Sequence, residues 1–432
     1  MLEASIQAAV LMAHQQPVFP MVLILELPLY ALIVAGIVRY RLIHRRAHRQ
    51  ARLHAPRVSC VITCYSEGPA VQNTIRSLAG QIYPGPIEIL AVVDGASANR
   101  ETWQALQAMR SELARSRHRV LKILPKWQRG GRVSSLNAGL QLSRGEIVMA
   151  LDGDTSFDNN MVAEAVSRMA DPAMLGLTGT LRVRNRQASL WTRFQALEYL
   201  VGLIATRTGL GAFNLLNNVS GAFGVFRRDV VTRMGGWECG TAEDLDMTMR
   251  LKRYGRRRRD RRIGFEPYAI GHTDVPASFR DLLKQRLRWD GDLFYIYARK
   301  HRSAFAPGIM GWPNLIATLW YGLLHQIVLP FVIVIYLIWI LLTRPAEQVL
   351  AAMILIYGLY LLISLVMTVI SIAMLSERRV EDLPLLLLLP LFPLYRGVMR
   401  LWSTVAILAE IVLETHKDSS MAPWWILKRS RY

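Results

Sequence analysis

The sequence predicts an α/β domain with a parallel sheet in the middle of the chain, flanked by transmembrane α-helices. Strand-like and helical segments alternate between residues 58 and 154, which is typical of a parallel sheet with helices on both faces. Apolar runs of membrane length lie at both ends of the chain, and none lies between residues 55 and 300. Hydrophobic residues make up 52% of the 432 residues and charged residues only 19%, which also favours a membrane protein.

The alternating segments end in polar residues. The strand-like runs are VSCVITCY, IEILAVVDG, VLKIL and EIVMALDGD, and the helical runs between them are VQNTIRSLAGQI, ETWQALQAMRSELARS and SSLNAGLQLSRG. Ligands bind at the carboxyl ends of the strands in such sheets. Three of these ends carry the polar groups Tyr65-Ser66-Glu67, Asp94-Gly95 and Asp152-Gly153-Asp154, so the sequence predicts a binding crevice there.

Residues 1–38 contain the first predicted transmembrane helix, from Val18 to Val38, about the length that crosses ~30 Å of hydrocarbon. Residues 39–54 form a basic linker; the stretch from Arg39 to Arg57 has seven arginines and no acid. Since positive residues stay cytoplasmic, we expect the N-terminus outside and the chain from Arg39 inside. A cleaved signal peptide is the rival interpretation, but no Lys or Arg precedes the run and no small-residue cleavage site follows it.

Residues 301–415 are predicted to form interfacial and transmembrane helices, about three in number. Their apolar blocks are Trp312–Thr343, Val349–Leu375 and Leu383–Leu413. The first is longer than one span and suits an interfacial helix followed by a crossing, whereas the prolines and arginines of the third suit a broken or partly interfacial segment. Three crossings would place the C-terminus outside, but the tail 416–432 is basic, so its orientation stays open.

The formal charge of +20 suits anionic partners. Its densest run is RYGRRRRDRR, Arg253–Arg262, which lacks the alternation of basic and aromatic residues that stacks bases. We therefore expect no nucleic acid, and either contact with anionic headgroups or a solvated face. The three cysteines form no CxxC pair, so neither a disulfide framework nor a zinc site is predicted.

Asp152 and Asp154 follow a hydrophobic strand with one glycine between them. Two carboxylates so close repel each other unless a cation lies between or beside them, which a divalent ion with oxygen ligands would satisfy. Upstream, Lys126, Arg129 and Arg132 suit diphosphate oxygens. The alternatives are an ordinary turn for the aspartates and a solvated loop for the cations.

Glu243, Asp244 and Asp246 are placed at the start of a predicted helix by GWECGTAEDLDMTMRLKRYG. Acids there interact favourably with the helix dipole. Three within four residues exceed that need, so one of these carboxylates is a candidate general base towards a hydroxyl nucleophile.

Four segments between Val58 and Trp289 resemble the motifs of the membrane-embedded, processive family 2 glycosyltransferases. VVDGASANRE is similar to the VVDDGS segment of that family, LDGDTSF to its DxD strand end, TAEDLDMTMRL to its (T)ED motif and KQRLRW to QxxRW. The family includes bacterial cellulose synthase, hyaluronan synthase, the nodulation chitooligosaccharide synthase and poly-N-acetylglucosamine synthase. The resemblance implies a cytosolic GT-A-type, Rossmann-like domain over residues 55–300.

The resemblance also implies roles for the matching residues, in four groups. The nucleotide-sugar would be bound by Tyr65, Glu67, Asp94, Arg132 and Asp152, and Mg²⁺ or Mn²⁺ by Asp154. Asp244 would be the catalytic base, and the acceptor would be bound by Glu243, Gln285, Arg288 and Trp289, with the indole stacked on the acceptor ring.

The implied activity is that of an inner-membrane β-glycosyltransferase with a cytoplasmic catalytic domain. It would polymerise a UDP-activated hexose, with UDP-N-acetylglucosamine favoured over UDP-glucose, into an exported polysaccharide or oligosaccharide. The expected partners are the UDP-sugar donor, the growing glycan, the lipid bilayer and a small membrane subunit. The alternatives are non-processive transfer to a lipid carrier, whose enzymes typically lack QxxRW, and an inactive membrane scaffold, against which the intact acidic motifs argue.

The sequence departs from the family at five positions. Gly95 replaces a second Asp, Ala242 stands where Thr or Ser often precedes the ED pair, and Arg132 replaces a common Lys. Asp290 and Asp292 follow the QxxRW motif, where relatives often have a small residue and Gly, and add charge near the predicted exit of the product.

Overall fold

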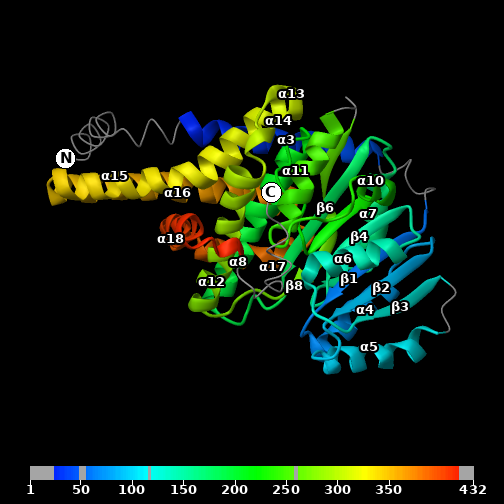
Figure 1. The fold of residues 1–432 in the computed structure, drawn as a ribbon. Coiled ribbons are helices and arrows are strands. Elements are labelled where there is room, and N and C mark those ends of the chain that lie inside the picture. Colours follow the sequence, from blue (N-terminus) through cyan, green and yellow to red (C-terminus); the bar gives the residue numbers. More distant parts are fainter. Residues whose placement is uncertain (1–23, 48–54, 115–117, 257–260, 418–432) are drawn as a thin grey trace.

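The structure of the chain, a computed structural model, describes residues 24–47, 55–114, 118–256 and 261–417. Its centre is an eight-stranded mixed sheet with the strand order β3-β2-β1-β4-β7-β6-β8-β5 (Figure 1). The strands are β1 (Val58–Cys64), β2 (Ile87–Asp94), β3 (Arg119–Lys126), β4 (Ile147–Asp152), β5 (Ser156–Phe157), β6 (Met174–Val183), β7 (Phe223–Arg227) and β8 (Arg262–Thr273).

The four strands predicted from the sequence form the parallel half of this sheet. β1 lies between β2 and β4, with Val58 opposite both Ile87 and Ile147. Every residue of β1 and β2 is buried, as expected for parallel strands covered on both faces. The other half differs from a purely parallel sheet, because β7 pairs antiparallel with β4 and β6.

Helices pack on both faces of the sheet and supply its two cores. One core joins the sheet to α4 (Val71–Ala79), α5 (Arg100–Leu113) and α7 (Met161–Met169). The other joins it to α6 (Gly131–Leu142), α10 (Arg228–Arg233) and α11 (Glu243–Arg256). Alternate side chains of β1 serve the two cores, since Ile62 belongs to the first and Val61 to the second. The two helical layers therefore cover the faces of the sheet, and the loops at the carboxyl ends of its parallel strands lie at the edge between them.

The remaining elements connect this domain to the long apolar helices. They are η2 (Gly68–Ala70), α8 (Leu190–Glu198), η3 (Tyr199–Ala205), α9 (Thr206–Ala212), α12 (Phe279–Phe294), η4 (Tyr295–Lys300), η5 (Arg302–Ala304), α13 (Pro307–Met310), α17 (Arg379–Asp382), η7 (Leu383–Leu388) and η8 (Thr415–Lys417).

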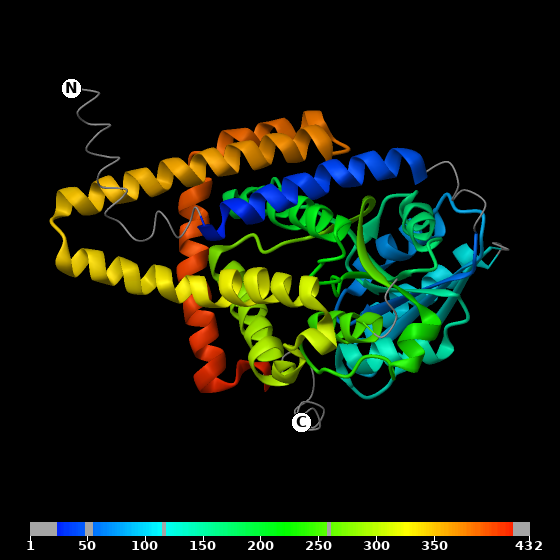
Figure 2. The same ribbon diagram turned by 90° about the horizontal axis from the view of Figure 1, so that it is seen from above.

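In the described part of the chain, two helices are long and apolar enough to cross a membrane. The first runs over Trp312–Thr343 as α14 (Trp312–Ala317), η6 (Thr318–Val328) and α15 (Leu329–Thr343), and the second is α16 (Ala346–Met374). α15 and α16 project from the body that contains the sheet as a hairpin (Figures 1 and 2). Arg379–Leu388 and α18 (Phe392–Leu413) meet at a bend of 76° and would form a third span only if the pair is counted as one. This bend agrees with the broken segment expected from the sequence.

Helix α3 (Leu27–Ala47) runs along the catalytic domain (Figure 2). It contains the described part of the predicted first span, of which residues 18–23 lie outside the described residues, and it continues into the predicted linker. Gly36 and Gly209 of α9 allow close approach, because a Cβ at Gly36 would lie 2.1 Å from the carbonyl oxygen of Gly209. Further along, Tyr40 Oη donates a 2.7 Å hydrogen bond to the buried carboxyl group of Glu266 on β8. α3 is thus fixed to the sheet by both backbone packing and a buried polar contact.

The Glu266 contact predicts a pH dependence of stability. Burial raises the pKa of Glu266 from its ordinary 4.5 to about 7, so between these values the folded chain holds a proton that the unfolded chain has released. The free energy of unfolding therefore falls as the pH rises through this interval. Glu266→Gln removes the titrating group and keeps an acceptor for Tyr40. We expect a smaller fall in unfolding temperature between about pH 5 and pH 8 in this variant.

Glu101→Gln is the matched control, since Glu101 is exposed at the start of α5. It should leave the pH dependence of the unfolding temperature as in the unsubstituted protein. An unchanged dependence in Glu266→Gln would contradict the prediction.

Candidate active site

The carboxyl ends of β1, β2 and β4 bring the predicted polar groups to one edge of the sheet. Thr63 lies opposite Asp152, and Cys64 lies opposite Val93, the residue before Asp94. A Cβ at Gly153 would come within 3.0 Å of the carboxyl group of Glu67. Glu67, Asp94, Asp152 and Asp154 therefore lie along one edge of the sheet, where the strand order predicts a ligand site.

Arg132, near the start of α6, is the centre of this edge. Its guanidinium donates to the carboxylates of Asp152 and Glu243, to Thr63 Oγ1 at 2.8 Å and to the carbonyl oxygen of Gly221 at 2.6 Å. The guanidinium thus joins a strand end, the first turn of α11 and the loop before β7. A lysine, with one nitrogen, could not make this set of contacts, which gives a physical reason for arginine at this position.

Asp94 is buried, and both of its carboxylate oxygens accept hydrogen bonds from the segment that joins β3 to α6. Its Oδ1 accepts hydrogen bonds from Lys126 Nζ at 2.7 Å and the backbone N–H of Gly130 at 2.8 Å, while Oδ2 accepts from the N–H of Gly131 at 2.8 Å. The carboxylate therefore shapes the loop before α6, and its predicted contact with the nucleotide stays a prediction. Lys126, predicted to meet a diphosphate, is paired with this carboxylate.

Arg129, the other cation predicted to meet a diphosphate, lies with its guanidinium carbon 4.5 Å from the centre of the exposed Tyr65 ring. The two side chains form a cation–π pair at the mouth of the crevice. This is a surface on which a planar base can lie.

Negative charge is concentrated at Glu67 and Asp154. Burial, together with the nearby carboxylates of Asp154 and Asp152, raises the pKa of Glu67 to about 7. Burial and Asp152 likewise raise the pKa of Asp154, and one buried carboxyl oxygen of Glu67 has no hydrogen-bond partner. A cation at this point would relieve the repulsion.

The donor set fits a metal that shares its ligands with a substrate. No group of three His, Cys, Asp or Glu side chains able to hold an ion by itself occurs in the described ranges. Mg²⁺ is commonly bound by one or two carboxylates together with substrate phosphates. Asp154, at the strand end, fits that arrangement.

The first turn of α11 separates its three acids by environment. Glu243 is buried against Arg132, and burial raises its pKa. Asp246 is buried against Lys300 Nζ at 2.8 Å and His301 Nε2 at 2.9 Å. Asp244 alone is not buried; its Oδ2 accepts from the N–H of Gly221 and from Asn218 Nδ2, both at 3.2 Å. Asp244 is thus the acid of this turn that a bound hydroxyl group can reach.

Helix α12 carries Gln285, Arg288 and Trp289 along the same side of the domain. Trp289 packs against the first core, and the guanidinium carbon of Arg286 lies 4.7 Å from the centre of its ring. Arg286 in turn pairs with Glu198 at 2.7 Å. The core packing and the cation–π contact with Arg286 together orient the indole of Trp289.

Asp290 and Asp292, the two residues of α12 that depart from the family pattern, contact other elements of the structure. Asp292 is buried and accepts a hydrogen bond from Thr241 Oγ1, one residue before Ala242. The pKa of Asp292 is raised to about 7, mainly by burial and also by the charges of Asp244 and Glu243, while the charge of Arg288 opposes this rise. Asp290 accepts from Ser403 Oγ of α18 at 2.7 Å. These acids tie α12 to its neighbours, and Ala242 adopts a left-handed φ of 54° where α11 begins.

The comparisons with known proteins agree with this geometry. The profile of the family described as "Glycosyl transferase family group 2" matches residues 147–370, which is half of the chain. The chain belongs to this family.

Two of the relatives that match part of the chain are named as synthases of a polysaccharide. Poly-beta-1,6-N-acetyl-D-glucosamine synthase of Staphylococcus epidermidis is 28% identical over 236 residues, covering 54% of this chain and 53% of the relative. The enzyme of the same name from Staphylococcus aureus strain COL is 27% identical over 237 residues, with the same shares. The chain thus spans about half the length of these curated relatives.

Among solved structures, a mannosyltransferase, PcManGT from Pyrobaculum calidifontis in complex with GDP-Man and Mn²⁺, superimposes with a TM-score of 0.55. The match is 20% identical in sequence and covers 90% of this chain and 99% of that one. At this identity the likeness shows the fold alone. It confirms the predicted GT-A-type, Rossmann-like class.

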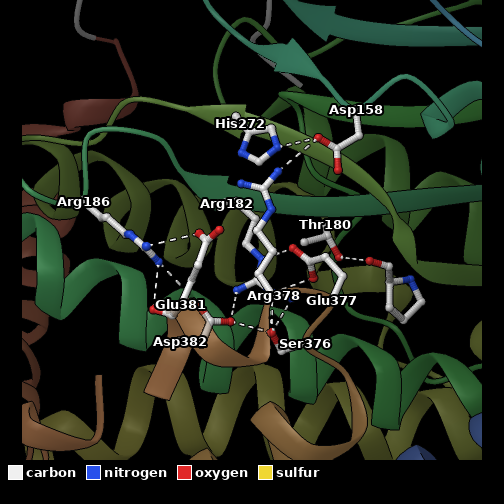
Figure 3. A network of polar contacts seen from close by, with 11 residues as sticks. Asp158, Thr180, Arg182, Arg186, His272, Ser376, Glu377, Arg378, Glu381 and Asp382 are labelled. Carbon is white, nitrogen blue, oxygen red and sulfur yellow. Dashed lines mark hydrogen bonds and ion pairs between the residues drawn. The ribbon is translucent and has the colours of Figure 1, made fainter. Parts of the chain in front are cut away.

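A polar network next to the glycosyltransferase site joins it to the connector after α16 (Figure 3). Arg182 of β6 donates to Asp382 at 2.8 Å and to Glu377 at 2.6 Å. Asp158, four residues after Asp154, contacts His272 Nε2 at 2.8 Å and the Arg378 guanidinium at 3.6 Å. The connector between two apolar helices therefore rests on β6 and β8, near Asp154, the predicted metal ligand.

His272 and Asp274, at the end of β8 and just after it, both have partners. His272 pairs with Asp158, and Asp274 with Arg184, whose Nη2 also donates to the backbone oxygen of Asp154 at 3.1 Å. These contacts hold the end of β8 next to the segment that follows β4.

Sequence reasoning missed three residues of the site. Asn99 donates to the carbonyl oxygen of Asp94 at 2.7 Å and accepts from the N–H of Ser66 at 3.0 Å. Asn218 donates to Asp244. Arg207 of α9 lies within electrostatic range of Asp244, and burial lowers the pKa of its guanidinium. Asn99 lies within the segment VVDGASANRE, but the resemblance gave no role to it; Asn218 belongs to NNVSG before β7, where polar residues precede a buried strand, and Arg207 belongs to no recognisable motif.

The contacts of Arg132 predict a large effect of its removal. Arg132→Met leaves the buried Glu243 without its cation, and breaking such a pair typically costs about 3–5 kcal/mol of stability. We expect a clear drop in unfolding temperature together with loss of glycosyl transfer. Adding Glu243→Gln should recover part of the stability, because the uncompensated charge is then removed.

Arg76→Met is the control, since Arg76 forms an exposed pair with Glu112 of a kind worth about 0–1 kcal/mol. If Arg132→Met is no less stable than Arg76→Met, Arg132 does not hold the site together.

Proposed function

We propose that this glycosyltransferase polymerises a UDP-activated hexose into a β-linked, exported polysaccharide or oligosaccharide at the inner membrane. UDP-N-acetylglucosamine is the favoured donor over UDP-glucose. The names of the two staphylococcal relatives support this choice, as does the layout of apolar helices around one catalytic domain.

One observation carries the proposal: Asp244 is the accessible acid of α11, while Glu243 and Asp246 are committed to cations. A general base must reach the proton that it removes. Asp244 lies beside Gly221, which also borders Arg132 and Glu243. The proposed base Asp244 is therefore close to Arg132, whose guanidinium binds Asp152 at the end of β4.

In the proposed reaction Asp244 takes the proton of the acceptor hydroxyl as its oxygen attacks the anomeric carbon of the donor. The bond from that carbon to the diphosphate breaks, UDP leaves, and inversion of an α-linked donor gives a β-linkage. Tyr65, Glu67, Asp94, Arg132 and Asp152 form the nucleotide-sugar site. Mg²⁺ or Mn²⁺ held by Asp154 would neutralise the charge of the leaving diphosphate.

The acceptor is assigned to Glu243, Gln285, Arg288 and Trp289. α12 also packs against α18: Trp402 Nε1 donates to the carbonyl oxygen of Leu283 at 2.8 Å. The acceptor helix thus adjoins the apolar helices, which supports export of the product through the bilayer, with a small membrane subunit as a further partner.

The proposal is tested by UDP release from the purified chain in nanodiscs, with UDP-N-acetylglucosamine and UDP-glucose supplied separately and Mn²⁺ or Mg²⁺ present. We expect release with UDP-N-acetylglucosamine and a polymeric product. Asp244→Asn should lower the rate about 100-fold or more, and EDTA or Asp154→Asn should also abolish release.

Asp229→Asn, an exposed acid paired with Arg233 on α10, is the control and should retain full activity. Transfer of a single sugar to lipid would favour the lipid-carrier alternative. Absence of release with either donor, or full activity of Asp244→Asn, would refute the proposal.

A further inference from the structure

A second polar cavity lies at the opposite end of α11 from the catalytic acids. Its volume is about 150 Å³, and it lies between the last turns of α11, the start of β8 and the α13–α14 turn. A cavity for one water molecule needs only about 10–15 Å³, so this cavity is large enough for a bigger ligand. Lys252, which lines it, is eight residues after Asp244 and so about 12 Å along the helix.

Among the described residues, the charged ones that line this cavity are all cations: Lys252, Arg256 and Arg261. In the ranges that the structure describes, none of the three forms an ion pair with a carboxylate; Arg261 instead donates to the carbonyl oxygen of Pro172. A Cβ at Gly311 would lie 3.6 Å from Arg256 Nε, so this guanidinium borders the α13–α14 turn. Positive charge therefore surrounds the cavity from two elements.

Lys252 is the most constrained of these cations. Its side chain is buried, with the residue 7% exposed, and its Nζ donates to Asn217 Oδ1 at 2.8 Å and Thr318 Oγ1 at 3.3 Å. An ammonium has three donors, so one remains for an occupant of the cavity. Burial lowers the pKa of Lys252 to about 7, which is the consequence of enclosing a cation without a carboxylate.

Asn314 adds an acceptor to the cations. It lines the cavity, and its Oδ1 is buried without a hydrogen-bond partner. A buried polar atom left without a partner is unfavourable. An anion that also carries a hydroxyl group would satisfy both the cations and this oxygen, and a terminal phosphate group that retains one proton has both features.

We infer that the cavity between α11, β8 and the α13–α14 turn is a binding site for a terminal phosphate group, held by Lys252, Arg256, Arg261 and Asn314. The ligand is either inorganic phosphate or the phosphate headgroup of an anionic lipid such as phosphatidic acid. Thr318 lies in the helix Trp312–Thr343, so the occupant would bridge the catalytic helix α11 and the first apolar helix of the C-terminal region.

A simpler explanation exists for one of these charges. Cations near a helix C-terminus interact favourably with its dipole, and Arg256 is in the last turn of α11. This effect accounts for an exposed arginine but does not require a buried lysine beside a cavity. It predicts no anion binding, so the two explanations are separable.

The test uses the full chain in phosphatidylcholine nanodiscs, titrated with inorganic phosphate by calorimetry. Lys252→Met should weaken binding about tenfold or more, because a charge-assisted hydrogen bond is lost. The variant should fold with an unfolding temperature at or above that of the unsubstituted chain, since it removes a buried unpaired charge. Arg253→Gln, an exposed neighbour outside the cavity lining, should bind as the unsubstituted chain does.

A second arm distinguishes the sources of the phosphate. Nanodiscs with phosphatidic acid are compared with phosphatidylcholine alone by unfolding temperature. Calorimetric binding that Lys252→Met abolishes supports free phosphate. A rise in unfolding temperature with phosphatidic acid, absent in Lys252→Met and without calorimetric binding, supports the lipid headgroup. If neither effect occurs, or if Lys252→Met behaves like the unsubstituted chain in both arms, the inference is overturned. Neither readout requires sugar transfer, so failure here is distinct from failure of the proposed function.

Discussion

The guanidinium of Arg132 is the contact on which the rest of the site depends. It lies among the end of β1, the DxD strand end, the loop before β7 and the first turn of α11. Buried carboxylates are tolerated when a cation pairs with them, and here one cation serves both Asp152 and Glu243. Glu243 is paired in this way, whereas the adjacent Asp244 accepts its hydrogen bonds from backbone N–H groups and the Asn218 amide.

The sequence predicted the parallel half of the sheet well because its signals are local. β1 to β4 are apolar runs that end in polar residues, and the helices between them have clear spacing. The antiparallel strand β7 could not be placed in this way, since FGVFR is short and its partners β4 and β6 are distant in the chain. The docking of α3 on α9 depends on two glycines that meet only in the folded chain.

The motifs identified the crevice residues as a set, but not the differences among them. Glu243, Asp244 and Asp246 look alike in the sequence, and their distinct environments come from Arg132, Lys300 and His301, which approach from other elements. Likewise, the sequence gives no sign that both oxygens of Asp94 are used by the loop of Gly130 and Gly131. The assignment of roles to single residues therefore needs tertiary contacts.

The packing of α12 against α18 limits where the chain can be shortened without breaking contacts. A predicted domain boundary at residue 300 separates α12 from Trp402 and Ser403, which bond to Leu283 and Asp290. The same cut removes the connector acids Glu377 and Asp382 from Arg182. A chain shortened to residues 55–300 would thus expose the face of α12 that packs on α18 and leave Arg182 without its counterions, so we expect residues 55–300 to be less stable alone than within the full chain.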